Sequence, residues 1–144
     1  MQQIRDLVKE DPQAIWLVAD MAYPATNIPA MAGADCLNTT QTYPQKTRWE
    51  MLDQEGECED IYNRYCHIRA SLGSKTMLEL VSTDYVEVTL SPEDLKKLNI
   101  RYIVSTNDFD ERIAAGTTNI FTDSGIEFQK YYEGTQLSIY GCVY

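Results

Sequence analysis

The chain has 144 residues, enough for one domain with an ordinary hydrophobic core. Hydrophobic residues make up 44% and charged residues 24%, a globular composition that excludes an intrinsically disordered chain. The formal net charge of −10 disfavours nucleic acids and anionic lipid headgroups as partners, because both require clustered Lys and Arg.

Sequence features that direct a chain to the membrane are not seen. No run approaches the roughly 18–20 apolar residues that span a bilayer. The first residues, MQQIRDLVKEDPQ, contain no apolar core of the kind found in secretory signals. Taken alone, this predicts a cytoplasmic protein; the alternative is one domain cut from a longer protein whose membrane-targeting parts lie elsewhere.

The first third of the chain predicts few regular elements. Residues 4–9 predict a short helix that the following Asp-Pro pair ends, and the apolar run AIWLVA at residues 14–19 is typical of a buried strand. Residues 20–45 are rich in Pro, Gly, Asn and Thr, and predict one short helix near residues 27–31. A long segment of this kind often carries function.

The remaining elements alternate between helix and strand. A helix is expected from Thr47. Residues 57–72 give the best helix signal of the chain, because apolar residues recur at steps of four, three and four: Ile61, Tyr65, Ile68 and Leu72. Residues 76–90 and 126–144 each predict a β-hairpin, and residues 91–105 predict a helix capped by Ser91 and then a strand. We expect an α/β domain, with α+β as the alternative: one mixed β-sheet covered by helices, with a C-terminal β-hairpin.

The four cysteines leave two alternatives open: Cys36, Cys58, Cys66 and Cys142 either include at least one disulfide or are all free thiols. On one continuous helix Cys58 and Cys66 would lie about 12 Å apart, beyond disulfide reach. The cysteine spacings do not match a zinc framework. We expect no cofactor.

A cysteine nucleophile is disfavoured. Cys66 and His67, the only histidine, are adjacent and would point about 100° apart on a helix, so they cannot form a dyad. The polar side chains of the predicted helix are expected to hold a neighbouring loop: Asp60, Asn63, Arg64 and His67.

Asp108 and Asp110 form an Asp-x-Asp directly after a predicted strand, where carboxylates can hold a divalent metal. No Gly-rich phosphate turn accompanies them. A metal-dependent, glycosyltransferase-like enzyme using these two residues is therefore the alternative function, and a free-standing cytoplasmic interaction module is another.

Aromatic and amide side chains gather around the long polar segment. Such groups give sugar rings a stacking plane and planar hydrogen bonding, although they could equally pack the segment against the helix. The candidate binding surface consists of Asn27, Asn38, Tyr43, Trp49, Tyr62, Asn63, Arg64 and His67. Asn38-Thr39-Thr40 also matches an N-glycosylation sequon.

The stretches YPQKTRWEMLD and EDIYNRYCHI, with the later LKKLNIRYIVS and the closing hairpin, carry a family resemblance. They resemble the C-terminal soluble region of large bacterial multi-spanning membrane proteins that are broadly related to lipid-linked-sugar glycosyltransferases. The matching positions are Trp16, Asn27, Asn38, Tyr43, Pro44, Trp49, Leu52, Asp53, Tyr62, Asn63, Arg64, Tyr65, His67 and Ile68. Cys66 departs from the pattern, which has a small residue such as Ala there.

The resemblance implies an extracytoplasmic domain at the cell membrane, attached to a membrane-embedded enzyme or transporter of cell-envelope glycans. Residues 1–12 would form the linker helix from the preceding membrane segment, and residues 13–144 a single α/β domain. We expect the domain to be non-catalytic and accessory. Its partners would be the membrane-embedded part of the same polypeptide and a glycan or lipid-linked sugar.

Overall fold

The secondary structure comes from a computed structural model that describes residues 1–106, 109–114 and 124–144. Its strands are β1 (Ile15–Val18), β2 (Asp35–Cys36), β3 (Thr40–Gln41), β4 (Cys66–Leu72), β5 (Met77–Ser82), β6 (Tyr85–Leu90), β7 (Ile100–Thr106), β8 (Glu127–Glu133) and β9 (Leu137–Val143). Its helices are α1 (Gln2–Glu10), the 3-10 turn η1 (Ala25–Asn27), α2 (Ile28–Met31), α3 (Lys46–Leu52), α4 (Glu59–Tyr62), α5 (Pro92–Lys97) and α6 (Phe109–Ala114).

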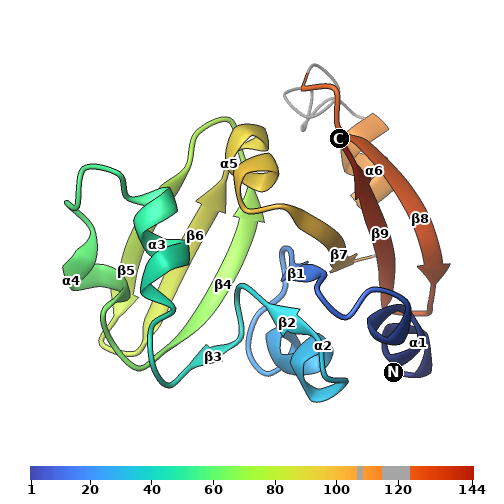
Figure 1. Ribbon diagram of the computed structural model, residues 1–144, viewed down its shortest axis with the longest axis horizontal. Helices are drawn as coiled ribbons and strands as arrows, with labels where there is room; N and C mark the ends of the chain where they lie inside the picture. The colour runs from blue at the N-terminus through green and yellow to red at the C-terminus, as the bar shows by residue number, and fades with distance from the viewer. Residues whose placement is uncertain (107–108, 115–123) are drawn as a thin grey trace.

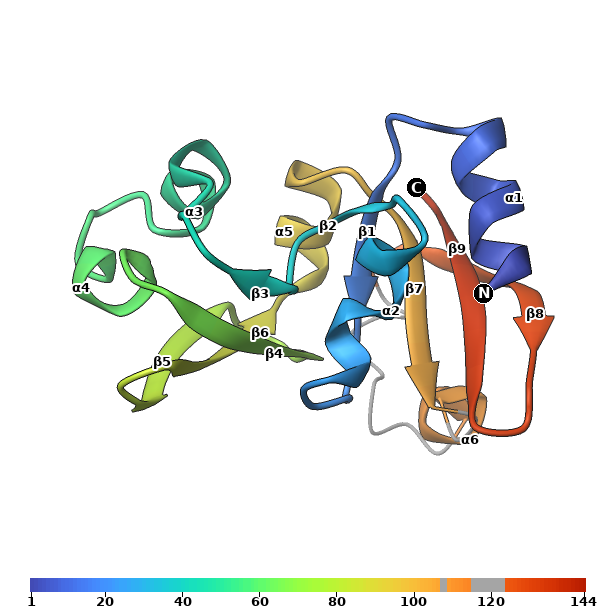
Figure 2. The ribbon, with the colours of Figure 1, turned by 90° about the horizontal axis from the view of Figure 1, so that it is seen from below.

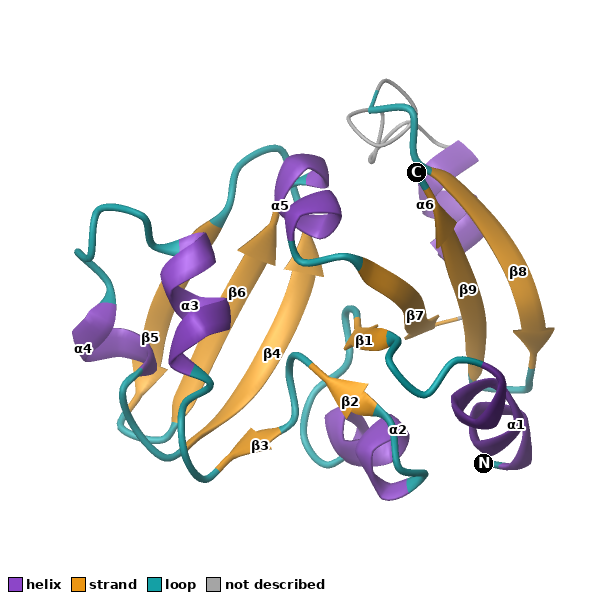
Figure 3. Ribbon diagram, viewed as in Figure 1, coloured by secondary structure: helices purple, strands orange, loops and turns teal. Residues whose placement is uncertain are grey.

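The fold is mixed α/β, closer to α+β because its helices are few and short (Figure 3). The predicted single sheet is divided into two mixed sheets, one of order β2-β1-β7-β9-β8 and one of order β3-β4-β6-β5 (Figure 1). The two sheets meet where Ala19, just after β1, forms an isolated bridge with Ala70 of β4. The Asp20 N–H continues this contact with a 2.8 Å hydrogen bond to the Ala70 carbonyl.

Strand β1 is buried on both faces, as its continuous apolar run predicts. Trp16 packs in a core cluster with Ile4 and Leu7 of α1, while Leu17 points into the larger core that reaches α5 and the four-stranded sheet. Period-two alternation on a strand sends successive side chains to opposite sides. β1 therefore has helix α1 on one face and the second sheet beyond the other.

The predicted helix over residues 57–72 is wrong. Helix α4 ends at Tyr62, and residues 66–72 form β4, which pairs in parallel with β6 from His67–Tyr85 to Leu72–Leu90. Burial in β4 has a period of two, with Cys66, Ile68 and Ala70 inside. The helical spacing of apolar residues is coincidental, because pairing with the distant β6 decides the local structure.

The other predicted elements are confirmed. Ser91 caps α5 by accepting a 3.2 Å hydrogen bond from the Asp94 N–H, and strands β5–β6 and β8–β9 form antiparallel hairpins. Strand β1, helix α2 near residues 27–31 and helix α3 all lie where the sequence predicts them.

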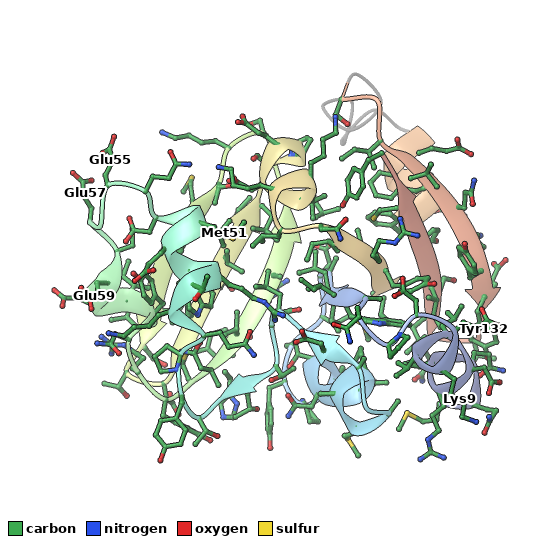
Figure 4. The ribbon with its side chains drawn as sticks, in the orientation of Figure 1. Lys9, Met51, Glu55, Glu57, Glu59 and Tyr132 are labelled. Carbon is green, nitrogen blue, oxygen red and sulfur yellow. The ribbon has the colours of Figure 1, made fainter. Side chains whose placement is uncertain are left out.

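Helix α1 packs on the domain through Ile4 and Leu7, and Tyr132 of β8, labelled in Figure 4, packs against the same core cluster. Among the described residues, none of the helices has the length and apolar character needed to cross a bilayer. That α1 follows a membrane segment stays a prediction.

One face of the four-stranded sheet is covered and the other is open. Figure 2 shows α3 and α5 on one side of this sheet, with no helix of the described chain on the other. The covered face carries the buried side chains Ile68, Val86 and Val88, whereas Arg69 and Glu87 lie on the open face.

Candidate functional site

Strand β3 places its two side chains on opposite faces of the four-stranded sheet. It pairs antiparallel with β4, with Thr40 opposite His67 and Gln41 opposite Cys66. Directly opposed residues of an antiparallel pair share a face. Gln41 and Cys66 therefore lie on the covered face, where both are buried, and Thr40 and His67 lie half-buried on the open face.

The Gln41 side chain joins three segments on the covered face. Its Oε1 accepts a 2.7 Å hydrogen bond from the Trp49 indole, and its Nε2 donates bonds of 2.7 Å and 2.9 Å to the carbonyls of Tyr62 and Arg64. Trp49 and Tyr62 are buried, and their rings stack with centroids 5.5 Å apart. These two aromatic residues therefore form part of the core beneath the predicted binding surface and do not present their rings to a ligand.

Asn38 extends the pairing of β1 beyond the end of β2. Its Nδ2 donates a 2.7 Å hydrogen bond to the Val18 carbonyl, and its Oδ1 accepts a 2.9 Å bond from the Val18 N–H. The side chain is fully buried, at 0% exposure. Asn38 is thus a structural residue that fixes the segment before β3, and the folded protein does not offer its amide for N-glycosylation.

A chain of hydrogen bonds links Asn27, Thr40 and His67. The Asn27 Oδ1 accepts a 2.8 Å bond from the Thr40 N–H, while its Nδ2 donates a 3.0 Å bond to the Thr40 hydroxyl. That hydroxyl lies 3.0 Å from the His67 Nδ1. The predicted residues Asn27 and His67, forty positions apart, are therefore held on one surface by a threonine that the sequence analysis did not select.

Two exposed tyrosines flank His67 on this surface. The rings of Tyr23 and His67 have centroids 4.2 Å apart and are tilted by 36°, and the Tyr65 ring meets His67 edge-on at 5.7 Å. Tyr23 is 52% exposed and Tyr65 is 53% exposed. We call Tyr23, His67 and Tyr65 the aromatic platform; it presents ring surface to solvent.

A pocket of about 250 Å³ lies along the free edge of β3, between this strand and α3. Tyr43 is its most exposed aromatic residue, at 85% exposure. Its lining combines hydroxyls, amides, a guanidinium and a thiol: Cys36, Leu37, Thr39, Thr40, Gln41, Thr42, Tyr43, Gln45, Arg48 and Trp49. We call this the β3 pocket.

The Arg48 guanidinium in the β3 pocket is fixed by a carboxylate. Its Nη1 donates a 2.9 Å hydrogen bond to Asp35 Oδ1, and its Nη2 pairs with Asp35 Oδ2. A guanidinium has five N–H donors in a rigid plane, so two bonds to Asp35 orient it and leave others for further partners. Arg48 gives the pocket an oriented donor.

Arg64 and Asn63, also predicted as binding residues, lie beside the end of α4. Arg64 donates 3.0 Å and 3.2 Å hydrogen bonds to the carbonyls of Ile61 and Thr83, and a further one to the carbonyl of Asp60. The guanidinium satisfies carbonyls at a helix end, a structural role. Asn63 is exposed, outside the lining of the β3 pocket.

The four cysteines are free thiols, and each has surroundings that keep its proton bound. Burial raises the pKa of Cys36 to about 12, of Cys66 to about 11 and of Cys142 to about 12. Burial followed by the charge of Asp53 also raises the pKa of Cys58. A thiol with a raised pKa is a poor nucleophile at neutral pH, and the Nδ1 of His67 is engaged with Thr40.

The alternative metal site falls partly outside the described residues. Asp108 is one of the residues that the structure does not describe, and Asp110 forms an ion pair with Lys130 of β8. No group of three His, Cys, Asp or Glu within residues 1–106, 109–114 and 124–144 could hold a metal ion. A metal bound by Asp110 would compete with Lys130 for the carboxylate.

The sequence matches a known protein family over its whole length. Residues 1–144 match the family described as "Domain of unknown function (DUF7654)". The chain belongs to this family. No curated protein and no solved structure matches the chain.

The structure divides the predicted surface into two groups. Asn38, Trp49, Tyr62 and Arg64 build the framework, and Trp49 also lines the β3 pocket. Tyr43 lies at this pocket, His67 lies in the aromatic platform, and Asn27 bonds Thr40 between them. Asn63 is exposed and belongs to neither group. The residues that connect them are Tyr23, Thr40, Gln41 and Arg48. The repeated hydroxyl and amide residues of Thr39-Thr40-Gln41-Thr42 are the sequence signal that could have indicated this edge.

Proposed function

We propose that this chain is a non-catalytic, glycan-binding accessory domain. In this proposal it belongs to a polytopic membrane protein of cell-envelope glycan metabolism and lies on the extracytoplasmic face of the membrane. The observation that carries the glycan assignment is the β3 pocket, where the exposed ring of Tyr43 lies among hydroxyls, amides and the oriented guanidinium of Arg48.

The chemistry of the β3 pocket suits a neutral sugar. Threonine hydroxyls both donate and accept hydrogen bonds, as sugar hydroxyls do, and the tyrosine ring offers an apolar face with a polar tip. Thr39, Thr42 and Tyr43 supply these groups at one edge. The volume of about 250 Å³ lies below the roughly 300–1,000 Å³ of pockets that enclose drug-sized ligands. It therefore fits one part of a larger ligand.

The charge of the protein disfavours an anionic ligand. The net charge is −10, and Figure 4 shows three outward-pointing carboxylates: Glu55 and Glu57 on the segment that joins α3 to α4, and Glu59 at the start of α4. Arg48, the cation of the pocket, already pairs with Asp35. A neutral sugar avoids the repulsion that a phosphate or uronic acid would meet.

The groups at the pocket favour binding over catalysis. The Cys36 thiol stays protonated at neutral pH because burial raises its pKa to about 12. General acid–base chemistry is most efficient with groups whose pKa lies near the working pH, and hydroxyls and amides are not such groups. These observations support an accessory role.

Mutation of Tyr43 tests the glycan proposal. Tyr43→Ala should reduce affinity for a bound neutral sugar about tenfold or more without changing the melting temperature, because the ring is almost fully exposed. Tyr131→Ala is the control for affinity, since Tyr131 is 52% exposed on β8 of the other sheet, where its ring packs on Tyr102, and its loss should leave sugar affinity unchanged. Equal affinity of the wild-type chain and Tyr43→Ala would contradict the proposal.

The proposed membrane location rests on the family resemblance. An antibody against this chain should detect a large membrane protein in fractionated source cells, trimmed when protease is added to intact spheroplasts. A small soluble band that is protected from the protease would contradict this location and would leave the pocket assignment standing.

A further inference from the structure

We propose that the ligand is an oligosaccharide of at least two rings, which occupies the β3 pocket with one ring and stacks the next on the aromatic platform. This inference rests on the proposed glycan function and specifies its ligand. The observation behind it is that one residue, Thr40, belongs to both surfaces: it lines the pocket, and its hydroxyl lies 3.0 Å from His67 of the platform.

The aromatic platform has the form of a stacking site. Tyr23 and Tyr65 keep 52% and 53% of their surface exposed, and both rings contact His67, at centroid distances of 4.2 Å and 5.7 Å. Large aromatic side chains in a core are usually buried, as Trp49 and Tyr62 are on the other face of this sheet. Ring surface held in a fixed cluster beside a polar pocket suits a flat ligand with apolar faces and polar edges.

The junction between the two surfaces is pre-organised. The Thr40 backbone N–H and hydroxyl are both bonded to the Asn27 side chain, and the hydroxyl is also bonded to His67. Thr40 therefore keeps its position without a ligand, which lowers the entropy cost of binding at this point. Asn27, which the sequence analysis selected, acts here as a positioning residue for Thr40.

The open sheet face continues beyond the platform with polar side chains. Arg69 and Glu87 pair across β4 and β6 at 3.3 Å, and the hydroxyls of Ser71 and Thr89 lie 3.4 Å apart further along. These groups are polar, and no helix of the described chain covers them (Figure 2). A chain of neutral sugars has the hydroxyl-rich edges and apolar ring faces that match this succession, whereas an anionic lipid surface would be repelled by the net charge of −10.

Chain length separates this inference from the proposed function. The probes are N-acetylglucosamine with chitotetraose, and glucose with cellotetraose, titrated into the wild-type chain by calorimetry. In at least one series, the tetramer should bind about tenfold or more tightly than the monomer, because it contacts both surfaces. Tyr65→Leu and Tyr23→Leu keep an apolar side chain and should remove this gain while leaving monomer affinity unchanged. Tyr131→Leu should preserve it.

Each alternative result contradicts a different statement. If monomer and tetramer bind equally and Tyr43→Ala weakens both, the second ring site is refuted and the pocket stands. If the tetramer depends on Tyr23 and Tyr65 but not on Tyr43, the pocket assignment is refuted and the platform is the primary site. If no sugar of either series binds to wild-type protein with well-dispersed amide resonances, both proposals are refuted.

Discussion

The Trp49 indole donates a 2.7 Å hydrogen bond to the side-chain oxygen of Gln41, so that helix α3 is fixed to a strand eight residues earlier in the chain. Both side chains are buried, and the same glutamine bonds the carbonyls of Tyr62 and Arg64. One amide thereby joins β3, α3, the end of α4 and the segment between α4 and β4. The wall of the β3 pocket depends on this connection.

Replacing Gln41 should destabilise the protein. Gln41→Leu leaves the buried Trp49 N–H without its hydrogen bond, and such an unsatisfied buried group costs about 1–3 kcal/mol. The Tyr62 carbonyl keeps its 2.9 Å bond from the Arg64 N–H, so we expect a loss of about 1–3 kcal/mol in the free energy of unfolding, measured by urea denaturation. Gln45→Leu, an exposed residue of the same pocket, is the control and should change stability by less than about 0.5 kcal/mol. Similar losses for the two variants would contradict the joining role of Gln41.

Asn38 should be intolerant of a charge. Asn38→Asp keeps the acceptor for the Val18 N–H but places a second carboxylate oxygen against the Val18 carbonyl, in a position that is 0% exposed. We expect a loss of about 2–4 kcal/mol at neutral pH, partly recovered in acid as the carboxyl group takes up a proton and donates to Val18. Asn63→Asp makes the same change on the exposed surface and should have little effect. If Asn38→Asp and Asn63→Asp have the same free energy of unfolding, the Asn38 side chain does not supply strand-like hydrogen bonds to the Val18 backbone.

Stability should fall in alkaline solution. Folding raises the pKa of Cys36 and Cys142 from 9.0 to about 12, and that of Cys66 from 9.0 to about 11, because burial disfavours the thiolate. The folded chain therefore keeps protons that the unfolded chain releases above pH 9.0, so this stabilisation is complete below that pH and is lost as the pH rises toward the folded values.

Urea unfolding between about pH 7 and about pH 11 measures this loss. Cys36→Ala removes one of the three thiols and should make the decline shallower, whatever its effect at neutral pH. A free energy of unfolding that stays constant above pH 9.0 would show that the thiols are not buried as described.

Local sequence signals predicted the elements that are stabilised by residues close together in the chain. The Ser91-Pro92 start of α5, the apolar run of β1 and the two hairpins depend on neighbouring residues, and all are found where expected. Residues 66–72 fit both a helix and a strand, and a parallel partner almost twenty residues away decides for the strand. The strict alternation of apolar and polar residues over 66–72 is a strand signal that overlaps with the helical spacing, and only the long-range pairing with β6 separates the two.

The candidate site was predicted only in part, because it too depends on contacts between distant segments. Aromatic and amide residue types indicated the site, and several of these residues do lie around β3. Residue type does not distinguish buried Asn38 and Trp49 from exposed Tyr43, because their exposure depends on packing between distant segments. Thr40 and Gln41 were not selected, since their roles come from a two-residue strand whose partner lies on β4.

The two tryptophans allow the most direct test of the β3 pocket as a sugar site. Trp49 lines this pocket, whereas Trp16 is buried in the cluster beside α1, so its indole N–H serves as an internal control. Chitotetraose and cellotetraose are titrated separately into nitrogen-15-labelled protein, and both indole resonances are followed. With at least one sugar, we expect a saturable shift of the Trp49 resonance with little change at Trp16, and no shift in Tyr43→Ala. With both sugars, an unmoved Trp49 resonance, or equal shifts at both tryptophans, would contradict glycan binding at this pocket.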